Sequence, residues 1–203
     1  MLGRVVTEAV RPRIYVRVPL NRLGAVLGKR GEVKLRIMER LGVRLTIDSE
    51  NSLVIVEAES PDVPPVNVMK ASEIIKAIAY GFPPEKAMRL LEEDQILVIV
   101  DLKQIVGDAP NHLKRIRGRI IGEAGRARKT IEEMTGTDIH VGEYIVAIIG
   151  DYERAMAAKK AVEMLAEGRM HSTVYRYLER VLREIKRREA LRLWAKDEFQ
   201  SGY

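Results

Sequence analysis

Apolar positions along the first part of the chain follow two periods in turn, which predicts strands alternating with helices. Ile14, Val16 and Val18 alternate with polar or aromatic neighbours, as in a half-buried strand, whereas later apolar residues recur at helical spacing. The predicted elements are a strand over 13–18, helices over 23–27 and 33–41, strands over 43–47 and 53–56, and a helix over 68–78. The order is therefore β-α-α-β-β-α.

The second part of the chain repeats this order. The predicted elements are a strand over 96–100, helices over 111–121 and 127–134, strands that include 139–141 and begin at 145, and a helix over 155–165. Five identities share one offset of 94 residues: Gly28 with Gly122, Gly31 with Gly125, Ile37 with Ile131, Glu39 with Glu133, and Gly42 with Gly136. Internal similarity of this kind indicates two copies of one structural unit.

Turn residues and changes of pattern predict where the copies begin and end. We expect an α+β protein made of an N-terminal extension over 1–12, a first domain over 13–82, a connecting helix or linker over 83–94, a second domain over 95–168, and a basic C-terminal helix and tail over 169–203. Pro83 and Pro84 can start the connecting helix, and the acidic run over 92–94 marks its end.

Charge is distributed unevenly along the 203 residues, whose formal net charge is +6. Between Arg169 and Lys196 there are nine basic and three acidic side chains, so this segment carries the whole excess. A basic balance admits nucleic acid as a partner. With two Phe and one Trp, however, the chain has little material for the aromatic platforms on which RRM or OB modules stack bases.

Composition also excludes several kinds of site. The chain has no cysteine and three histidines far apart in sequence, so we expect no metal and no cofactor. No apolar run reaches the length of a membrane span, and the first residues lack a secretory signal, so we expect an intracellular, cytoplasmic protein. A charged fraction of 32% without cysteine is typical of a thermophile's protein.

Two glycine loops each join two predicted helices. The first is Gly28-Lys29-Arg30-Gly31 and the second is Gly122-Glu123-Ala124-Gly125. Glycine permits a tight turn at positive φ and exposes the backbone, and the N–H groups that start the next helix can then meet a phosphate. A single Gly-x-x-Gly is more often an ordinary turn. Its recurrence at equivalent places in two copies favours phosphate binding.

The two loops differ in charge. Lys29 and Arg30 give the first loop a basic middle and Lys34 follows, which suits a phosphate backbone, whereas Glu123 puts an acid in the middle of the second. The cations around the second loop are Lys114, Arg115, Arg117, Arg119, Arg126, Arg128 and Lys129, seven within sixteen residues. Because a patch of one sign repels itself unless a polyanion neutralises it, we expect RNA contact here as well.

An apolar pair precedes each loop, Val26-Leu27 and Ile120-Ile121, and the whole arrangement resembles two KH domains over about 13–81 and 95–168. The resemblance implies a three-stranded antiparallel sheet with three helices in each copy, and a groove that holds four single-stranded nucleotides. Its walls would be 26–31 with 45–47, and 120–125 with 139–141. The candidate RNA-binding residues are Val26, Leu27, Gly28, Lys29, Arg30, Gly31, Lys34 and Ile47 in the first copy and Arg117, Arg119, Ile120, Ile121, Gly122, Gly125, Arg126, Arg128 and Lys129 in the second.

Nearly the whole chain resembles a narrower family, the archaeal members of the ribosome-assembly proteins called partner of Nob-one or Dim-two homologues. Segments 118–122, 125–132, 146–150 and 168–178 carry this resemblance. It implies a protein without catalysis of its own that binds the single-stranded 3′ end of small-subunit ribosomal RNA. It also implies a maturation endonuclease and the alpha subunit of translation initiation factor two as partners.

The sequence bears on three other functions. A nucleotide-binding P-loop enzyme fails because three residues, not four, separate Gly24 from Gly28, and Arg30 follows Lys29 where Ser or Thr is needed. A KH protein of RNA decay, such as an exosome cap subunit, usually carries a further all-β domain for which the twelve residues before Arg13 leave no room. A protein scaffold that has lost RNA binding stays open because of Glu123.

The last predicted helix, from Ser172, has two contrasting faces. Its apolar face consists of Val174, Leu178, Val181 and Ile185, and its basic face of Arg176, Arg180, Arg183 and Arg187. We therefore expect a helix that packs on the second domain and exposes a basic outer surface.

Overall fold

The computed structural model describes residues 12–200, with side chains as far as Leu191, so that the expected N-terminal extension lies almost entirely outside the described residues. The chain divides between Leu91 and Glu92 into two compact units, here called the first and the second unit. Among the described residues, no helix combines the length and the apolar character that crossing a bilayer requires.

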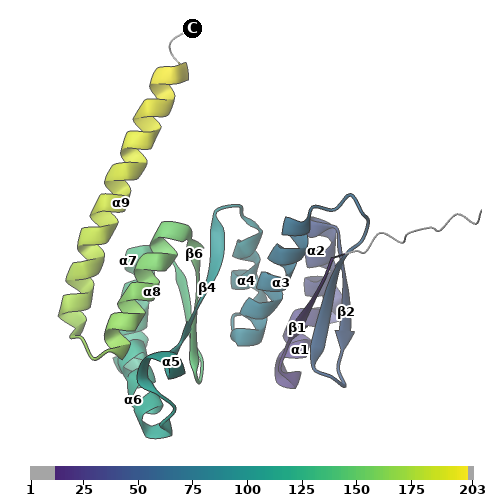
Figure 1. The fold of residues 1–203 in the computed structure, drawn as a ribbon, viewed down its shortest axis with the longest axis horizontal. Helices are drawn as coiled ribbons and strands as arrows, with labels where there is room; N and C mark the ends of the chain where they lie inside the picture. The colour runs from purple at the N-terminus through teal and green to yellow at the C-terminus, as the bar shows by residue number, and fades with distance from the viewer. Residues whose placement is uncertain (1–11, 201–203) are drawn as a thin grey trace, which may run out of the picture. The chain divides into compact units, whose positions relative to one another are not determined.

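The first unit contains the predicted β-α-α-β-β-α order. Its elements are β1 (Arg13–Arg17), α1 (Leu20–Leu27), the 3-10 turn η1 (Lys29–Gly31), α2 (Glu32–Leu41), β2 (Val43–Asp48), β3 (Leu53–Ala58), α3 (Pro65–Tyr80), α4 (Pro84–Ala87) and the 3-10 helix η2 (Met88–Leu91) (Figure 1). The segment predicted as one connecting helix is thus a short α-helix continued by a 3-10 turn, and both belong to the first unit.

The second unit repeats this order and adds two helices. Its elements are β4 (Gln95–Asp101), α5 (Leu102–Val106), α6 (Pro110–Ile121), the 3-10 turn η3 (Glu123–Gly125), α7 (Arg126–Thr135), β5 (Asp138–Val141), β6 (Ile145–Asp151), α8 (Tyr152–Ala166) and α9 (His171–Gln200) (Figure 1). The short helix α5 was not predicted. Asp101 caps it by accepting a hydrogen bond from the amide of Lys103 at 2.8 Å.

Each unit is built on a three-stranded antiparallel sheet whose central strand comes last in the sequence. The strand orders are β1-β3-β2 and β4-β6-β5. Along β3, the buried side chains Val54, Val56 and Ala58 alternate with half-buried ones, so one face of the sheet packs on the helices. The mixed α/β class, the two three-stranded antiparallel sheets and the C-terminal helix are thereby confirmed.

The hairpin between β2 and β3 is held by side chains of its own turn. Asn51 donates to the carboxylate of Asp48 from its backbone amide at 3.0 Å and from its side-chain amide at 2.7 Å. These hydrogen bonds lower the pKa of Asp48, because they favour the charged carboxylate. Ser52 completes the turn with a φ of 56°.

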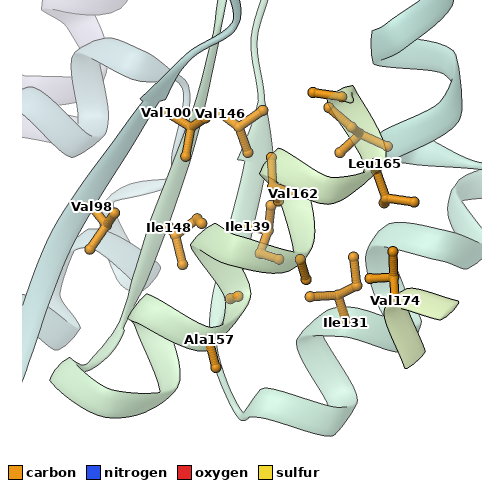
Figure 2. Close-up of a cluster of buried hydrophobic side chains, with 14 of the residues drawn as sticks. Val98, Val100, Ile131, Ile139, Val146, Ile148, Ala157, Val162, Leu165 and Val174 are labelled. Carbon is orange, nitrogen blue, oxygen red and sulfur yellow. The ribbon is translucent and has the colours of Figure 1, made fainter. Parts of the chain in front are cut away.

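The core of the second unit lies between its sheet and the helices α6, α7, α8 and α9. Figure 2 shows side chains from the sheet and from α7, α8 and α9 pointing toward one another. They include Val98 and Val100 from β4, Val146 and Ile148 from β6, Ile139 from β5, Ile131 from α7, Val162 and Leu165 from α8, and Val174 from α9. The last helix is therefore part of this core, because Val174 is as fully buried as the side chains of the sheet.

Candidate nucleic-acid interface

The two glycine loops have nearly the same backbone, although their middle residues differ. Gly28 and Gly122 have φ/ψ values of 74°/175° and 73°/175°. Gly31 and Gly125 have values of 83°/8° and 77°/10°. All four lie at positive φ, where glycine pays no Cβ penalty. The repeat seen in the sequence is therefore a repeat of local geometry.

Only glycine fits at the first position of each loop. A Cβ atom on Gly28 would lie 2.5 Å from Cγ2 and 2.8 Å from the backbone nitrogen of Val33. On Gly122 it would lie 2.6 Å from Cβ and 2.7 Å from the backbone nitrogen of Ala127. A Cβ on Gly31 would meet nothing within 4 Å. The first glycine thus lets the loop close onto the next helix, and the second only supplies its φ.

One residue inside each loop adopts a backbone conformation that is rare for residues other than glycine. Arg30 has a φ of 52° and Ala124 a φ of 49°, both in the left-handed region. Non-glycine residues stay there only when the surrounding structure imposes it. A residue with a long cationic side chain and one with only a methyl group thus have the same backbone conformation. The fold, and not the side chain, therefore determines the conformation of the loop.

Each loop leads directly into a ten-residue helix, α2 or α7. The N-cap residues are Gly31 and Gly125, which have no side chain to bond the first amides of the helix. The amide of the first helical residue, Glu32 or Arg126, instead donates to the carbonyl of Lys29 or Glu123. The amides that follow it, with the positive end of the helix dipole, can bind an anion at the loop. The first residues of the two helices have opposite charges: the acidic Glu32 starts α2, and the basic Arg126 starts α7.

The cationic side chains at the first loop are accessible. Lys29 and Arg30 are exposed and Lys34 is half-buried. In the part of the chain that the structure describes, none of these three side chains forms a hydrogen bond or an ion pair with another residue. They are therefore accessible to a ligand, and their contact with a phosphate backbone stays a prediction.

The second loop is more balanced in charge. Beside it lies a hollow of about 260 Å³. The hollow is lined by Glu123, Ala124, Arg126, Lys129, Thr130 and Glu133. Arg126 and Lys129, both predicted as RNA-binding, therefore share this surface with two carboxylates, which reduce its attraction for an anion.

The seven cations predicted as one patch do not share one surface. Arg115 and Arg119 line a different cleft of about 730 Å³, together with His112 of α6 and Glu167 at the end of α8. Arg117 is half-buried, and its Nε is buried without a hydrogen-bond partner among the described residues. A buried unpaired donor costs free energy that a ligand can recover, so Arg117 stays in the candidate set.

Arg119 has a structural role that the sequence does not indicate. Its Nη2 donates to the carbonyl of Arg169 at 2.7 Å, and its Nε lies 3.4 Å from the carbonyl of Leu165. The guanidinium therefore ties α6 to the end of α8. In the first unit, Arg22 does the same for α3, where it donates to the carbonyls of Ile78 and Phe82 at 2.9 Å and 2.7 Å.

Arg128 is also engaged within the protein. Its Nη1 lies 3.0 Å from the carboxylate of Glu132 and 3.2 Å from the carbonyl of Ile139. The same carboxylate accepts the amide of Ile139 at 2.8 Å. Because β5 is an edge strand, these contacts occupy its outer backbone groups and fasten α7 to it. We call this group of three residues the α7–β5 clasp.

The apolar pairs before the loops are only partly accessible. Val26 and Ile120 are completely buried in the two cores, whereas Leu27 is 42% exposed and Ile121 is half-buried, as is Ile47 on β2. We therefore narrow the apolar surface open to a ligand to Leu27, Ile47 and Ile121. A helical pattern alone could have separated Val26 from Leu27, since neighbours in a helix face different directions.

Comparison with known proteins places this geometry in a class. Residues 96–183 match the family model of the second KH domain of PNO1, described as a eukaryotic type KH-domain, KH-domain type I. A KH domain-containing protein of Methanocaldococcus jannaschii is 38% identical over 181 residues, which cover 89% of this chain and 78% of the relative. The second unit is thus a KH domain.

Two crystal structures resemble almost the whole chain. A protein of unknown function from Aeropyrum pernix is 73% identical, with a TM-score of 0.90 over 93% of this chain and 100% of the other. Dim2p of Pyrococcus horikoshii, solved in a complex with the alpha subunit of initiation factor 2 and rRNA, is 42% identical, with a TM-score of 0.80 over 87% of this chain and 97% of the other. The chain belongs to the PNO1/Dim2 family of KH-domain proteins.

Proposed function

We propose that this protein binds the single-stranded 3′ end of small-subunit ribosomal RNA and acts in the assembly of the small ribosomal subunit. The observation that carries the proposal is the first loop, in which exposed, unpaired Lys29 and Arg30 stand at the start of α2, where the N-cap Gly31 has no side chain to bond the helix amides. A single strand can lay its phosphates there and its bases against Leu27 and Ile47.

The proposal includes the first unit as a second KH domain. Support comes from its strand order, which is the same as in the second unit, and from the equal loop geometry. Two such domains in one chain extend the length of RNA that can be held, and a linked second site raises the overall affinity.

The family supports the choice of RNA and partners. The Pyrococcus horikoshii relative was crystallised with rRNA and the alpha subunit of initiation factor 2, and a Yarrowia lipolytica relative is named pre-rRNA-processing protein PNO1. We extend both partners to this chain, and keep the maturation endonuclease as a further partner. Membership of this family favours ribosome assembly over the alternative in RNA decay.

The test is fluorescence anisotropy with a labelled RNA that matches the 3′ end of small-subunit ribosomal RNA. We expect Lys29→Asp/Arg30→Asp to lower the affinity at least tenfold, or about 1.4 kcal/mol. Its control is Arg17→Asp/Lys76→Asp, which makes the same change of charge at exposed positions on β1 and α3 and should bind like the wild type. Duplex and scrambled RNA serve as competitors.

Either of two results would contradict the proposal. If the wild type binds no RNA, the chain is a protein scaffold. If the loop variant and its control lose affinity equally, binding reflects net charge and not the first loop.

A further inference from the structure

The helix α9 is fastened to the second unit along one side. Its buried side chains are Val174, Leu178, Leu182 and Ile185. Two ion pairs with α8 continue the attachment, Glu189 to Arg154 at 3.0 Å and Arg188 to Glu153 at 3.4 Å. The helix extends to Gln200, and Figure 1 shows it running back along α8 and continuing well past the start of that helix.

The opposite side of α9 carries a ridge of arginines. The ridge consists of Arg176, Arg180, Arg183 and Arg187. At about 100° per residue they fall within a strip roughly 60° wide, centred opposite the buried side chains, and extend over about 16 Å of the helix axis. All four are exposed, and within the described part of the chain none has a hydrogen bond or an ion pair from its side chain.

The contrast between the two sides indicates that the ridge does not serve the fold. The charged residues that hold α9 in place, Arg188 and Glu189, have partners on α8. Ridge arginines three and four residues apart repel one another and gain nothing from the core. Guanidinium groups are well suited to phosphates, which they bind through two parallel hydrogen bonds. A polyanion is therefore the ligand that matches this surface.

The shape of the ridge decides which polyanion it fits. A single strand needs a groove that follows its backbone and side chains that contact its bases. The ridge lies on the exposed side of α9, and a hollow of about 350 Å³ between this helix and Met134 of α7 includes only Arg183 of its residues. Among the side chains of α9 that the structure describes, the aromatic Tyr175 and Tyr177 are packed partly against the core. A duplex instead presents rigid rows of phosphates with its bases turned inward.

We propose that the α9 ridge binds the phosphate backbone of double-stranded RNA. The identity of this RNA rests on the proposed function. The duplex would be a stem of the same ribosomal RNA, next to the single strand held by the glycine loops. The ridge is a separate surface with its own ligand, and its test separates the two.

The test compares three RNAs: the single-stranded 3′ end, the same strand joined to a hairpin stem, and the stem alone. We expect the stem to raise the affinity of the wild type about tenfold. The variant Arg176→Gln/Arg180→Gln/Arg183→Gln/Arg187→Gln should lose this gain and bind the single strand normally. Each duplex phosphate contact contributes about 0.9 to the salt dependence, so the slope for the stem should fall by roughly 2 to 4.

Two further variants serve as controls. Replacing the same four residues with Lys keeps the charge and should retain most of the gain. Glu179→Gln/Glu184→Gln removes the acids that flank the ridge and should strengthen binding to the stem. A circular dichroism melt checks that each variant keeps its helices.

Three outcomes would overturn the inference: a stem that adds nothing to wild-type affinity, a glutamine variant that keeps the full gain, or a variant that loses single-strand and stem binding equally. The first outcome would leave an acidic protein surface as the ligand of the ridge. If the wild type instead binds the stem through the ridge but not the single strand, the ridge stands and the proposed function fails.

Discussion

The loops of the two units share a backbone and differ in what surrounds them. In the first unit, Lys29 and Arg30 are exposed and unpaired beside the start of α2. In the second, Glu123 lies in a hollow where acidic and basic side chains balance. The difference teaches that the fold provides the same loop backbone twice, and that the side chains then set the charge that each loop presents.

The strand edges next to the loops differ as well. The α7–β5 clasp of Arg128, Glu132 and Ile139 has no counterpart in the first unit, because at the offset of 94 residues the positions of Arg128 and Glu132 are occupied by Lys34 and Met38. A methionine cannot bind either a guanidinium or an edge amide. The first unit therefore keeps the unpaired cation Lys34 where the second has an internal ion pair.

The largest expected effect tests whether the first loop depends on its first glycine. Gly28→Ala should destabilise the first unit by roughly 2–4 kcal/mol, because the new methyl group overlaps Val33 and the residue must keep a positive φ. Gly31→Ala, with open space around it, should cost only about 1 kcal/mol. Urea unfolding gives both values, and amide exchange in α2 assigns the loss to this unit. Equal effects at the two positions would refute the steric explanation.

A smaller effect should follow from opening the clasp. Glu132→Met gives the second unit the residue of the first and leaves the amide of Ile139 and the charge of Arg128 without their partner. We expect a loss of about 1–3 kcal/mol and faster hydrogen exchange at Ile139. Glu133→Met, at the exposed neighbouring position, is the control and should change neither. Unchanged exchange at Ile139 in the Glu132 variant would show that the clasp contributes nothing.

The smallest effect should come from exchanging the middle residues of the loops. Lys29→Glu/Arg30→Ala should reduce affinity for the single-stranded 3′ end about tenfold, or 1.4 kcal/mol. Glu123→Lys/Ala124→Arg should increase it by a few-fold, less because carboxylates remain nearby. Both changes should shrink in high salt, as screening requires. A second-loop exchange that weakens binding would show that Glu123 itself contacts the RNA.

The regular elements could be predicted because each depends on residues close together in the chain. The alternation of Val16 and Val18 with polar neighbours, and the glycine at the end of α2, are local signals that the structure follows. The unpredicted helix α5 has only five residues, too few for a helical period to show. An aspartate such as Asp101, which caps it, is equally common in turns, so the sequence does not indicate a helix there. Likewise, no local signal divides 83–94 into α4 and η2.

The candidate site was less predictable, because contacts distant in sequence decide which cations are free. Arg119 binds carbonyls 46 and 50 residues further along the chain, and nothing near it in the sequence distinguishes it from the exposed Arg126. The glycine loops were predictable because their requirement is local. Buried Val26 and Ile120 could have been assigned to the core from helical spacing.

The equal backbone of the two loops has a kinetic consequence. A loop whose shape is imposed by the fold needs little rearrangement when RNA arrives, so the encounter rate sets how fast the complex forms. Changes at Lys29 and Arg30 should then appear partly in the association rate at low salt, because charge guides the approach. Changes at Leu27 and Ile47, which can act only after contact, should appear in the lifetime of the complex.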